Sequence, residues 1–288
     1  MTSEVNLSVG FSPRLARNLS RAGWVVELLD EVDSTNARAM GKPQPWALVA
    51  AHLQTSGRGR LTRSWQAPAG SAVTMSMTLP LPADGATWGW APLFVGDAVR
   101  GALVDVLEDK GVGRVGTKWP NDLLVRDPDG TWRKVGGILC QMTRSADGTP
   151  LVVAGVGLNV SQEREELPVE TATSLRCAGY DIGREAVIEA VAAHVMASAV
   201  TWGRASGHEV AALRKRMRDH CLTIGADVDI HTPDGAVHRR CATGIDDEGR
   251  LEAVPLGEQT DSPNRMAYSV ADIVHARLHR SDDLRTGQ

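Results

Sequence analysis

The sequence predicts a fold that mixes helices and strands, with a small β-barrel at its C-terminal end. The chain has 288 residues, 42% hydrophobic and 23% charged, which is an ordinary globular balance able to bury a core. Apolar, strand-like runs alternate with segments of helical periodicity up to Cys221. After Cys221, short strands separated by turns at "PDG" and "DEG" occupy about sixty residues, a pattern typical of a small barrel.

The first half of the chain gives alternating elements. "SPRLARNL" opens with a serine cap and a proline in the first helical position, so it predicts a short helix. The strand "WVVELLDEV" follows, and "DSTNARAM" predicts a helix capped near Asp33 or Ser34. The remaining expectations are strands at "WALVAAH" and "SAVTMSMTLP", and a helix from Pro92 to Glu108 whose apolar residues recur at helical spacing.

The second half continues the pattern. "DLLVR" and "KVGGILCQM" predict two strands joined by a turn at "DPDG", and "PLVVAGVGLNV" predicts a third. Helices are expected at "REAVIEAVAAHVMASAVTW", with Val187, Val191, Val195 and Trp202 on one stripe, and at "EVAALRKRMRDHC", which is basic on one side. "RMAYSVADIVHARL" closes the barrel, and the last eight residues are expected to form a loose tail.

Composition excludes several classes of protein. The net charge of −4 argues against wholesale nucleic-acid binding, which needs a basic face. Four scattered cysteines without C-x-x-C spacing favour reduced thiols packed as small hydrophobes. No run approaches the ~20 apolar residues of a membrane span, and the N-terminus lacks the apolar core of a signal peptide. We therefore expect a cytoplasmic protein that does not engage a membrane.

The segment "GRGRLTRSW", residues 57–65, is the first candidate for chemistry. Its glycines allow close approach to a ligand, and Arg58, Arg60 and Arg63 offer permanently charged donors suited to phosphate or carboxylate. No Walker pattern occurs in the chain, so this is not a common P-loop. Taken alone, the segment is equally compatible with a solvated loop or an RNA-binding segment.

Three further stretches carry polar residues at strand ends. In "TKWPNDLL", Lys118 stands four residues before Asp122 across a proline bend and could meet a phosphate, while Asp122 could bind Mg²⁺ or a ribose hydroxyl. In "KVGGIL", Lys134 precedes two glycines that let the strand pass close under a substrate. In "GVGLNV", Asn159 ends a buried strand and needs a partner or a ligand. Singly, these residues are also compatible with a salt-bridged turn or a solvated lysine.

Taken in order, "DSTN", "QTSGRGRLTRSW", "KWPNDLL", "KVGGIL" and "GVGLNV" resemble the successive signatures of the biotin–protein ligases, over about Asp33 to Val160. Composition and periodicity alone indicate no more than an α/β enzyme with an anion-binding loop. The resemblance implies an α+β fold: a mixed β-sheet with flanking helices, like the class II aminoacyl-tRNA synthetases, followed by a small SH3-like β-barrel. The expected boundaries are a catalytic domain at 1–220, the barrel at 221–280 and a tail at 281–288.

The resemblance also implies a two-step reaction. ATP with Mg²⁺ activates the carboxylate of biotin to biotinyl-5′-AMP, and a lysine of a biotin carboxyl carrier domain, from an acyl-CoA or pyruvate carboxylase, then takes the biotin. Some ligases of this kind carry an N-terminal helix-turn-helix and bind DNA. Here about thirty residues with one short helix precede "DSTN", too few for such a domain, so we expect a monofunctional ligase with no DNA partner.

By the same resemblance, each motif supplies site residues. Lys134 and Arg60 are the expected catalytic residues, and Asp122 is the expected Mg²⁺ ligand. Biotin would be bound by Ser34, Thr35, Asn36, Gln54, Gly57, Arg58, Gly59, Arg60, Lys134 and Gly136. ATP and the adenylate would be bound by Arg60, Arg63, Trp65, Lys118, Asn121, Asp122 and Asn159. The arginine loop is expected to order over the ligand and exclude water. Thr62 departs from the family pattern, which has glycine there, so loop closure is expected to differ in detail.

Two other functions fit part of the pattern. A lipoate–protein ligase shares the fold and the chemistry, but the "GRGR" loop together with "KWPND" and "K-x-GGIL" favours biotin. A nucleic-acid-binding module could use the arginine loop, but the loop lacks interleaved aromatic residues for stacking on bases.

Overall fold

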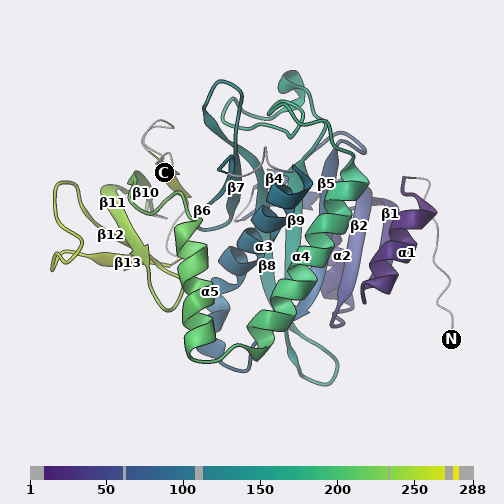
Figure 1. Ribbon diagram of the computed structural model, residues 1–288, viewed down its shortest axis with the longest axis horizontal. Coiled ribbons are helices and arrows are strands. Elements are labelled where there is room, and N and C mark those ends of the chain that lie inside the picture. Colours follow the sequence, from purple (N-terminus) through teal and green to yellow (C-terminus); the bar gives the residue numbers. More distant parts are fainter. Residues whose placement is uncertain (1–9, 61–62, 108–112, 233, 270–274, 279–288) are drawn as a thin grey trace.

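The computed structural model describes residues 10–60, 63–107, 113–232, 234–269 and 275–278, and its main feature is a seven-stranded sheet (Figure 1). The sheet has the order β1 (Val25–Val32), β2 (Ala47–Gln54), β5 (Ala72–Pro80), β9 (Pro150–Asn159), β8 (Trp132–Arg144), β7 (Asp122–Arg126) and β6 (Val115–Lys118). The helices are α1 (Pro13–Arg21), α2 (Thr35–Gly41), α3 (Ala91–Val106), α4 (Arg184–Arg204) and α5 (His208–Asp219), with short 3₁₀ turns η1 (Gly85–Trp90) and η3 (Arg164–Glu166).

The sheet is mixed, as the sequence led us to expect. β1 and β2 run parallel because the short helix α2 connects them, while every other pairing in this sheet is antiparallel. The predicted helix caps are also present. Ser12 accepts a hydrogen bond from the Leu15 amide at the start of α1, and Ser34 accepts one from the Ala37 amide at the start of α2.

The two faces of the sheet are covered unequally. α3 and α4 lie across one face, with α1 beside them near β1 (Figure 1), and the large apolar core lies between these helices and the strands. On the other face, α2 covers β2, β5 and β9, and the apolar cluster there consists of Ala39, Val49 and Val153 with Leu29 and Met40 packed against it. The second face therefore leaves room for a pocket beside α2.

Helix α4 is buried on the stripe that the sequence predicts. Val187, Val191, Val195 and Trp202 are all buried, and the Trp202 ring stacks on Phe94 of α3 at a centroid distance of 4.4 Å. By length and composition alone α4 could cross a membrane, which the sequence analysis did not expect. Its packing against α3 and β5 makes it a core helix of this fold.

The C-terminal part forms a separate five-stranded antiparallel sheet, in agreement with the small all-β unit expected there. Its order is β13 (Met266–Tyr268), β12 (Leu251–Pro255), β11 (Val237–Ile245), β10 (Asp227–His231) and β14 (His275–Leu278). The basic side of α5 holds this sheet in place. Arg214 and Arg218 both lie over the Trp90 ring, and Arg218 donates to the Ile245 carbonyl of β11. These arginines therefore serve internal packing rather than a binding surface.

The sequence analysis found the long elements and missed short ones. It did not predict β6, η1, η3 or the two-residue strands β3 (Gly57–Arg58) and β4 (Ser64–Trp65). Elements of two to six residues carry too little periodicity to stand out from a loop. The expected tail at 281–288 lies outside the described residues, and the domain boundary at residue 221 stays a prediction.

Candidate active site

A pocket lies on the less covered face of the large sheet, beside α2, and encloses about 880 Å³ including its mouth. The residues that line it come from α2, from the β3–β4 and β6–β7 hairpins and from strands β2, β5, β8 and β9. They are Ser34, Thr35, Asn36, Gln54, Arg58, Gly59, Arg60, Arg63, Ser64, Trp65, Met75, Lys118, Trp119, Pro120, Asn121, Asp122, Lys134, Gly137, Ile138, Leu139, Gly155, Val156 and Gly157. Most of the residues expected from the sequence are therefore in one place.

The arginine segment forms a small hairpin at the pocket wall. Gly57 pairs with Trp65, and Arg58 pairs with Ser64. A Cβ at residue 57 would overlap the Trp65 carbonyl oxygen, so only glycine allows the two strands to approach this closely. The hairpin directs Arg58 and Arg60 into the pocket lining. Thr62, where the sequence departs from the family pattern, lies outside the described residues.

The β6–β7 hairpin and β8 bring the two expected lysines onto one carboxylate. Lys118 and Asp122 are paired across the hairpin, with 3.7 Å between Lys118 Nζ and Asp122 Oδ2. Lys134 of β8 approaches from the next strand, with its Nζ 2.5 Å from Asp122 Oδ1. Arg60 NH1 donates to Asn121 Oδ1 at 3.4 Å and so crosses the pocket from the opposite hairpin. Asp122 therefore lies among Lys118, Lys134 and Arg60 at one end of the pocket.

Burial and charge act in opposite directions at this end. Burial raises the pKa of the Asp122 carboxyl, but Lys134, Lys118 and Arg60 together outweigh burial and hold the pKa below its ordinary value. Burial also lowers the pKa of the Arg60 guanidinium, against the attraction of Asp122. Asp122 is therefore ionised at neutral pH, and Arg60 keeps its charge as arginine does in proteins.

The other end of the pocket is neutral and rich in hydrogen bonds. Thr35 donates to Gln54 Oε1 through both its amide, at 2.8 Å, and its hydroxyl, at 3.0 Å. Because this oxygen is already engaged, Gln54 has its amide N–H groups left to present to a ligand. Behind Thr35, the Ser76 hydroxyl donates to Asn36 Oδ1 at 2.5 Å, and Asn36 Nδ2 donates to Gln141 Oε1 at 3.0 Å. This series of hydrogen bonds fixes the orientation of the N-terminus of α2.

Two glycines of "GVGLNV" make room for side chains of the site. A Cβ at residue 155 would overlap the Asn36 amide, and a Cβ at residue 157 would lie 2.6 Å from Trp65 Cε2. The indole of Trp65 therefore packs on the bare backbone of β9. These glycines were part of the quoted motif, but the sequence analysis gave them no role of their own.

Three expected residues do not line the pocket: Gly57, Gly136 and Asn159. Gly136 faces β9, where a Cβ would overlap the Gly157 carbonyl oxygen. Asn159 is buried and its amide is used within the protein. Its Nδ2 donates to the Thr173 carbonyl at 2.9 Å, and its Oδ1 accepts from Gln162 Nε2 at 2.9 Å. Asn159 therefore has the partner that its buried position required.

The sequence analysis missed a set of apolar and backbone contributions to the lining. These residues are Met75, Trp119, Pro120, Gly137, Ile138, Leu139, Gly155, Val156 and Gly157, together with Ser64. Apolar residues on a strand carry the same pattern whether they face a core or a ligand, so periodicity cannot separate the two. Trp119 and Pro120 lie between Lys118 and Asp122 in "TKWPNDLL", where the sequence indicates a proline bend but not that these two residues line a pocket.

The described residues offer no ready-made metal centre. No group of three or more His, Cys, Asp or Glu side chains among them could hold a metal ion. Asp122 is the one carboxylate among the described lining residues, and both of its oxygens lie near an ammonium group. Mg²⁺ is commonly held by one or two carboxylates together with substrate phosphates, so Asp122 fits only as a single protein ligand of a nucleotide-borne ion.

Comparison with known proteins agrees with this geometry. Residues 30–159 match the model of the biotin/lipoate A/B protein ligase family. The chain is 31% identical over 266 residues to a biotin–[acetyl-CoA-carboxylase] ligase of Mycobacterium tuberculosis, and the match covers 89% of this chain and 91% of that protein. The chain belongs to the biotin/lipoate A/B protein ligase family.

Other members of the ligase family extend the comparison. A bifunctional ligase/repressor of Bacillus subtilis is 32% identical over 212 residues, which cover 71% of this chain and 60% of that protein. A solved biotin protein ligase from Aquifex aeolicus, in complex with biotin and ATP, superposes with a TM-score of 0.69 at 24% identity, over 88% of this chain and 98% of that one. The structural match confirms the fold expected from the sequence, and the Mycobacterium tuberculosis relative confirms the family.

Proposed function

We propose that this protein joins biotin to a lysine of a carrier protein with consumption of ATP. The observation that carries the proposal is the division of one pocket into a neutral, hydrogen-bonding end and a cationic end. Among the described lining residues the cationic end holds Arg58, Arg60, Arg63, Lys118 and Lys134 against the single carboxylate of Asp122. Biotin is a neutral ureido ring joined to a carboxylate by an apolar chain, so it matches this division end for end.

The first step joins two anions, which explains the excess of cations. A biotin carboxylate oxygen attacks the α-phosphorus of ATP, a P–O bond forms, and pyrophosphate leaves as the α–β bridging bond breaks. Lys134 and Arg60 would lie beside the reacting oxygens and offset their charge as it develops. Lys118 and Asn121, on the β6–β7 hairpin, would contact the nucleotide phosphates. Magnesium ion bound to ATP would supply further charge neutralisation, and Asp122 would hold it as a single protein ligand.

The second step releases the product. The amine of the carrier lysine attacks the acyl carbon of biotinyl-5′-AMP, a C–N bond forms, and AMP leaves with the electron pair of the broken C–O bond. The lysine sheds a proton to give the amide. Carrier domains of acyl-CoA or pyruvate carboxylases are the partners we propose, and we place the reaction in the cytoplasm. Thr35 and Gln54 would hold the ureido ring during both steps.

Lipoate ligation is the alternative within the same family. Lipoate has a dithiolane ring that neither donates nor accepts strong hydrogen bonds, so it would leave the Gln54 amide N–H groups facing an apolar ring. A site built to hydrogen-bond a polar group rejects an analogue that lacks it. The neutral end therefore supports biotin. A nucleic-acid role of the arginine loop has less support, because Arg58, Arg60 and Arg63 line the pocket.

The proposed function is tested by ATP–pyrophosphate exchange with radioactive pyrophosphate. We expect exchange that depends on biotin and is absent with lipoate at the same concentration. Transfer is then measured by mass spectrometry of a purified carrier domain, which should gain one biotinyl group. Exchange with lipoate but not biotin would replace the proposed substrate, and exchange with neither would contradict the adenylation chemistry.

A further inference from the structure

Lys134 lies at the point on β8 where the hydrogen-bonded neighbour on one side changes from β9 to another segment. From Gly136 onward β8 pairs with β9, but at Lys134 the β9 side is taken by a different segment, residues 171–173. The Lys134 amide donates to the Thr171 carbonyl at 2.9 Å, and the Lys134 carbonyl accepts from the Thr173 amide at 2.8 Å. We call residues 171–173 the strap. Both backbone polar groups of Lys134 are therefore held by the strap.

The sheet on the other side of Lys134 is irregular. On β7, Leu123 pairs with Gly136 and Leu124 pairs with Lys134, so Val135 is an extra residue in the register. Such a bulge bends a strand and re-aims the side chains next to it. Because a bulge loosens the relation between neighbouring strands, the direction of the Lys134 side chain depends on the strap as well as on β7.

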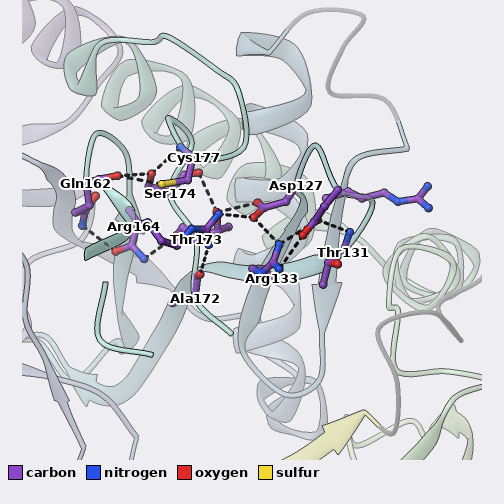
Figure 2. Close-up of polar contacts among 12 residues, drawn as sticks. Asp127, Thr131, Arg133, Gln162, Arg164, Ala172, Thr173, Ser174 and Cys177 are labelled. Atoms are coloured by element: carbon purple, nitrogen blue, oxygen red, sulfur yellow. Dashed lines mark hydrogen bonds and ion pairs between the residues drawn. The ribbon is translucent and has the colours of Figure 1, made fainter. Parts of the chain in front are cut away.

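Buried polar side chains fix the strap to the end of β7. Figure 2 shows Thr173, Arg164 and Arg133 directed toward Asp127, the residue that follows β7. The Thr173 hydroxyl donates to Asp127 Oδ1 at 2.8 Å, and Arg164 NH2 and Arg133 NH1 each donate to Asp127 Oδ2 at 2.7 Å. Thr173 is fully buried and Asp127 is 2% exposed. Arg164 NH1 also reaches the Ala172 carbonyl of the strap at 3.1 Å.

Strand β7 therefore holds Lys134 in two ways, through the side-chain ammonium and through the backbone. The N-terminal end of β7 carries Asp122, which contacts the Lys134 ammonium, and Asp127 beyond its C-terminal end grips the strap that holds the Lys134 peptide. Asn159 adds a third tie, since its Nδ2 donates to the Thr173 carbonyl. The network lies outside the pocket lining, so it can act on the reaction only through the residue it holds.

We propose that Thr173 and Asp127 are positioning residues for Lys134, acting through the strap. The proposal rests on the proposed function, because it assigns Lys134 to the reacting oxygens. It also gives Asn159 a place in the strap network instead of a contact with ATP. A displacement of about 1 Å in a catalytic group can cost on the order of a hundredfold in rate, and the strap would prevent such a displacement.

The test uses Thr173→Val, which keeps the shape of the side chain and removes the hydroxyl donor to Asp127. We expect kcat for biotin-dependent pyrophosphate exchange to fall by about tenfold or more, with KM for biotin and ATP changed by less than about threefold. Thr173→Ser restores the donor and should restore kcat. The matched control is Thr87→Val, because Thr87 is also buried and donates to the Asp84 carbonyl at 2.8 Å, away from the pocket lining.

A double-mutant cycle separates positioning from general damage. If Thr173 acts through Lys134, then Thr173→Val should add less than about twofold to the loss already caused by Lys134→Ala. A full, additive loss in that background overturns the proposal. So does a folded Thr173→Val enzyme whose kcat equals that of Thr87→Val.

A second variant covers the case in which Thr173→Val does not fold. The Arg164 side chain is 43% exposed, so Arg164→Gln loosens the strap with less disturbance of the core. Its control is Arg176→Gln, because the Arg176 side chain is similarly exposed, at 50%, and its ion pair with Glu163 lies outside the strap. The same kcat loss and the same cycle with Lys134→Ala are expected for Arg164→Gln, and their absence contradicts the proposal.

Hydrogen exchange supplies a readout that needs no activity. Loosening of the strap should speed exchange of the Lys134 amide, which donates to Thr171, in Thr173→Val or Arg164→Gln but not in the two controls. Unchanged exchange at Lys134 overturns the proposal even for an active enzyme. If the wild type shows no biotin-dependent activity, the proposed function is contradicted. Faster exchange of the Lys134 amide in the variants would still show that the strap holds the Lys134 backbone.

Discussion

The two ends of the pocket differ in how their polar groups are satisfied before any ligand arrives. At the neutral end, Thr35, Ser76 and Asn36 form a chain of hydrogen bonds among buried side chains. At the cationic end, Lys118, Lys134 and Arg60 all act on one carboxylate, Asp122, and Arg58 and Arg63 are further cations of the described lining. Apart from the Gln54 amide N–H groups, the polar groups of the first end are satisfied within the protein, whereas the second end gains most when an anion is added.

This difference assigns different tasks to the two ends. A preformed hydrogen-bonding surface recognises a ligand at little cost in ordering, so it sets affinity. A cluster of like charges offset by one carboxylate stabilises negative charge as it develops, so it sets rate. Changes at the cationic end should therefore act mainly on kcat, and changes at the neutral end mainly on KM for biotin.

The largest effect is expected for Lys134→Ala. Loss of a charged donor beside the reacting oxygens typically costs on the order of 10²–10³ in rate. Pyrophosphate exchange should fall by this amount while the melting temperature changes little, because a partly exposed lysine adds little stability. The matched control is Lys215→Ala, which removes an exposed lysine paired with Asp219. Near-normal exchange by folded Lys134→Ala enzyme would remove Lys134 from the catalytic residues.

Arg60→Gly should affect retention of the intermediate. Arg60 crosses the pocket to Asn121 and is half-buried, so its loss opens the cationic end to water. A charged hydrogen bond contributes about 1.5–3 kcal/mol, which predicts roughly tenfold to 150-fold faster escape of biotinyl-5′-AMP. We expect the variant to biotinylate albumin, which has no carrier domain, faster than wild type does at equal adenylate production. Equal labelling of albumin would show that Arg60 does not retain the intermediate.

Ser76→Ala tests the neutral end. The change leaves Asn36 Oδ1 without its donor, and the net loss of one buried hydrogen bond is about 0.5–1.5 kcal/mol. We expect KM for biotin to rise roughly two- to twelvefold with kcat nearly unchanged. The control is Ser71→Ala, which removes a buried hydroxyl that donates to the Pro68 carbonyl just before the same strand begins. A fall in kcat with constant KM would break the proposed division of tasks.

The smallest effect concerns pH. Because the pKa of Asp122 is lowered in the folded protein, the stability it contributes is present above the unfolded value of about 3.9 and is lost only as pH falls through the lower folded value. The difference in melting temperature between wild type and Asp122→Asn should therefore stay constant from pH 5 to 8 and change only in more acidic solution. A change between pH 6 and 8 would mean that the lysines do not hold this carboxylate ionised.

Much of the fold followed from the sequence because its elements are long and clearly periodic. The stripe of Val187, Val191 and Val195 on α4 and the capped start of α2 at Ser34 depend on local patterns, and both are present. The site residues within the charged motifs also came together, since hairpins place Lys118 beside Asp122 by local pairing.

The parts that the sequence did not reveal depend on distant contacts. Ser76 has the pattern of one more polar position on an alternating strand. Only the fold places it against α2, where its partner Asn36 lies forty positions earlier in the sequence. Thr173 lies in a stretch without periodicity, and its contact with Asp127 joins residues 46 positions apart. Asn159 was read as a nucleotide ligand, whereas its partners are Thr173 and Gln162, which no strand-end pattern could identify.

The central claim is that the neutral end sets the affinity for biotin and the cationic end sets the rate, and calorimetric titration of biotin tests it most directly. On Ser76→Ala, biotin should bind roughly two- to twelvefold more weakly than on wild type, which corresponds to the loss of one buried hydrogen bond. On Lys134→Ala, biotin should bind with an affinity within about threefold of wild type, although pyrophosphate exchange is largely lost. A loss of biotin affinity in Lys134→Ala as large as the loss in rate would contradict the account, because Lys134 would then act on the bound carboxylate and not on the charge that develops during the reaction.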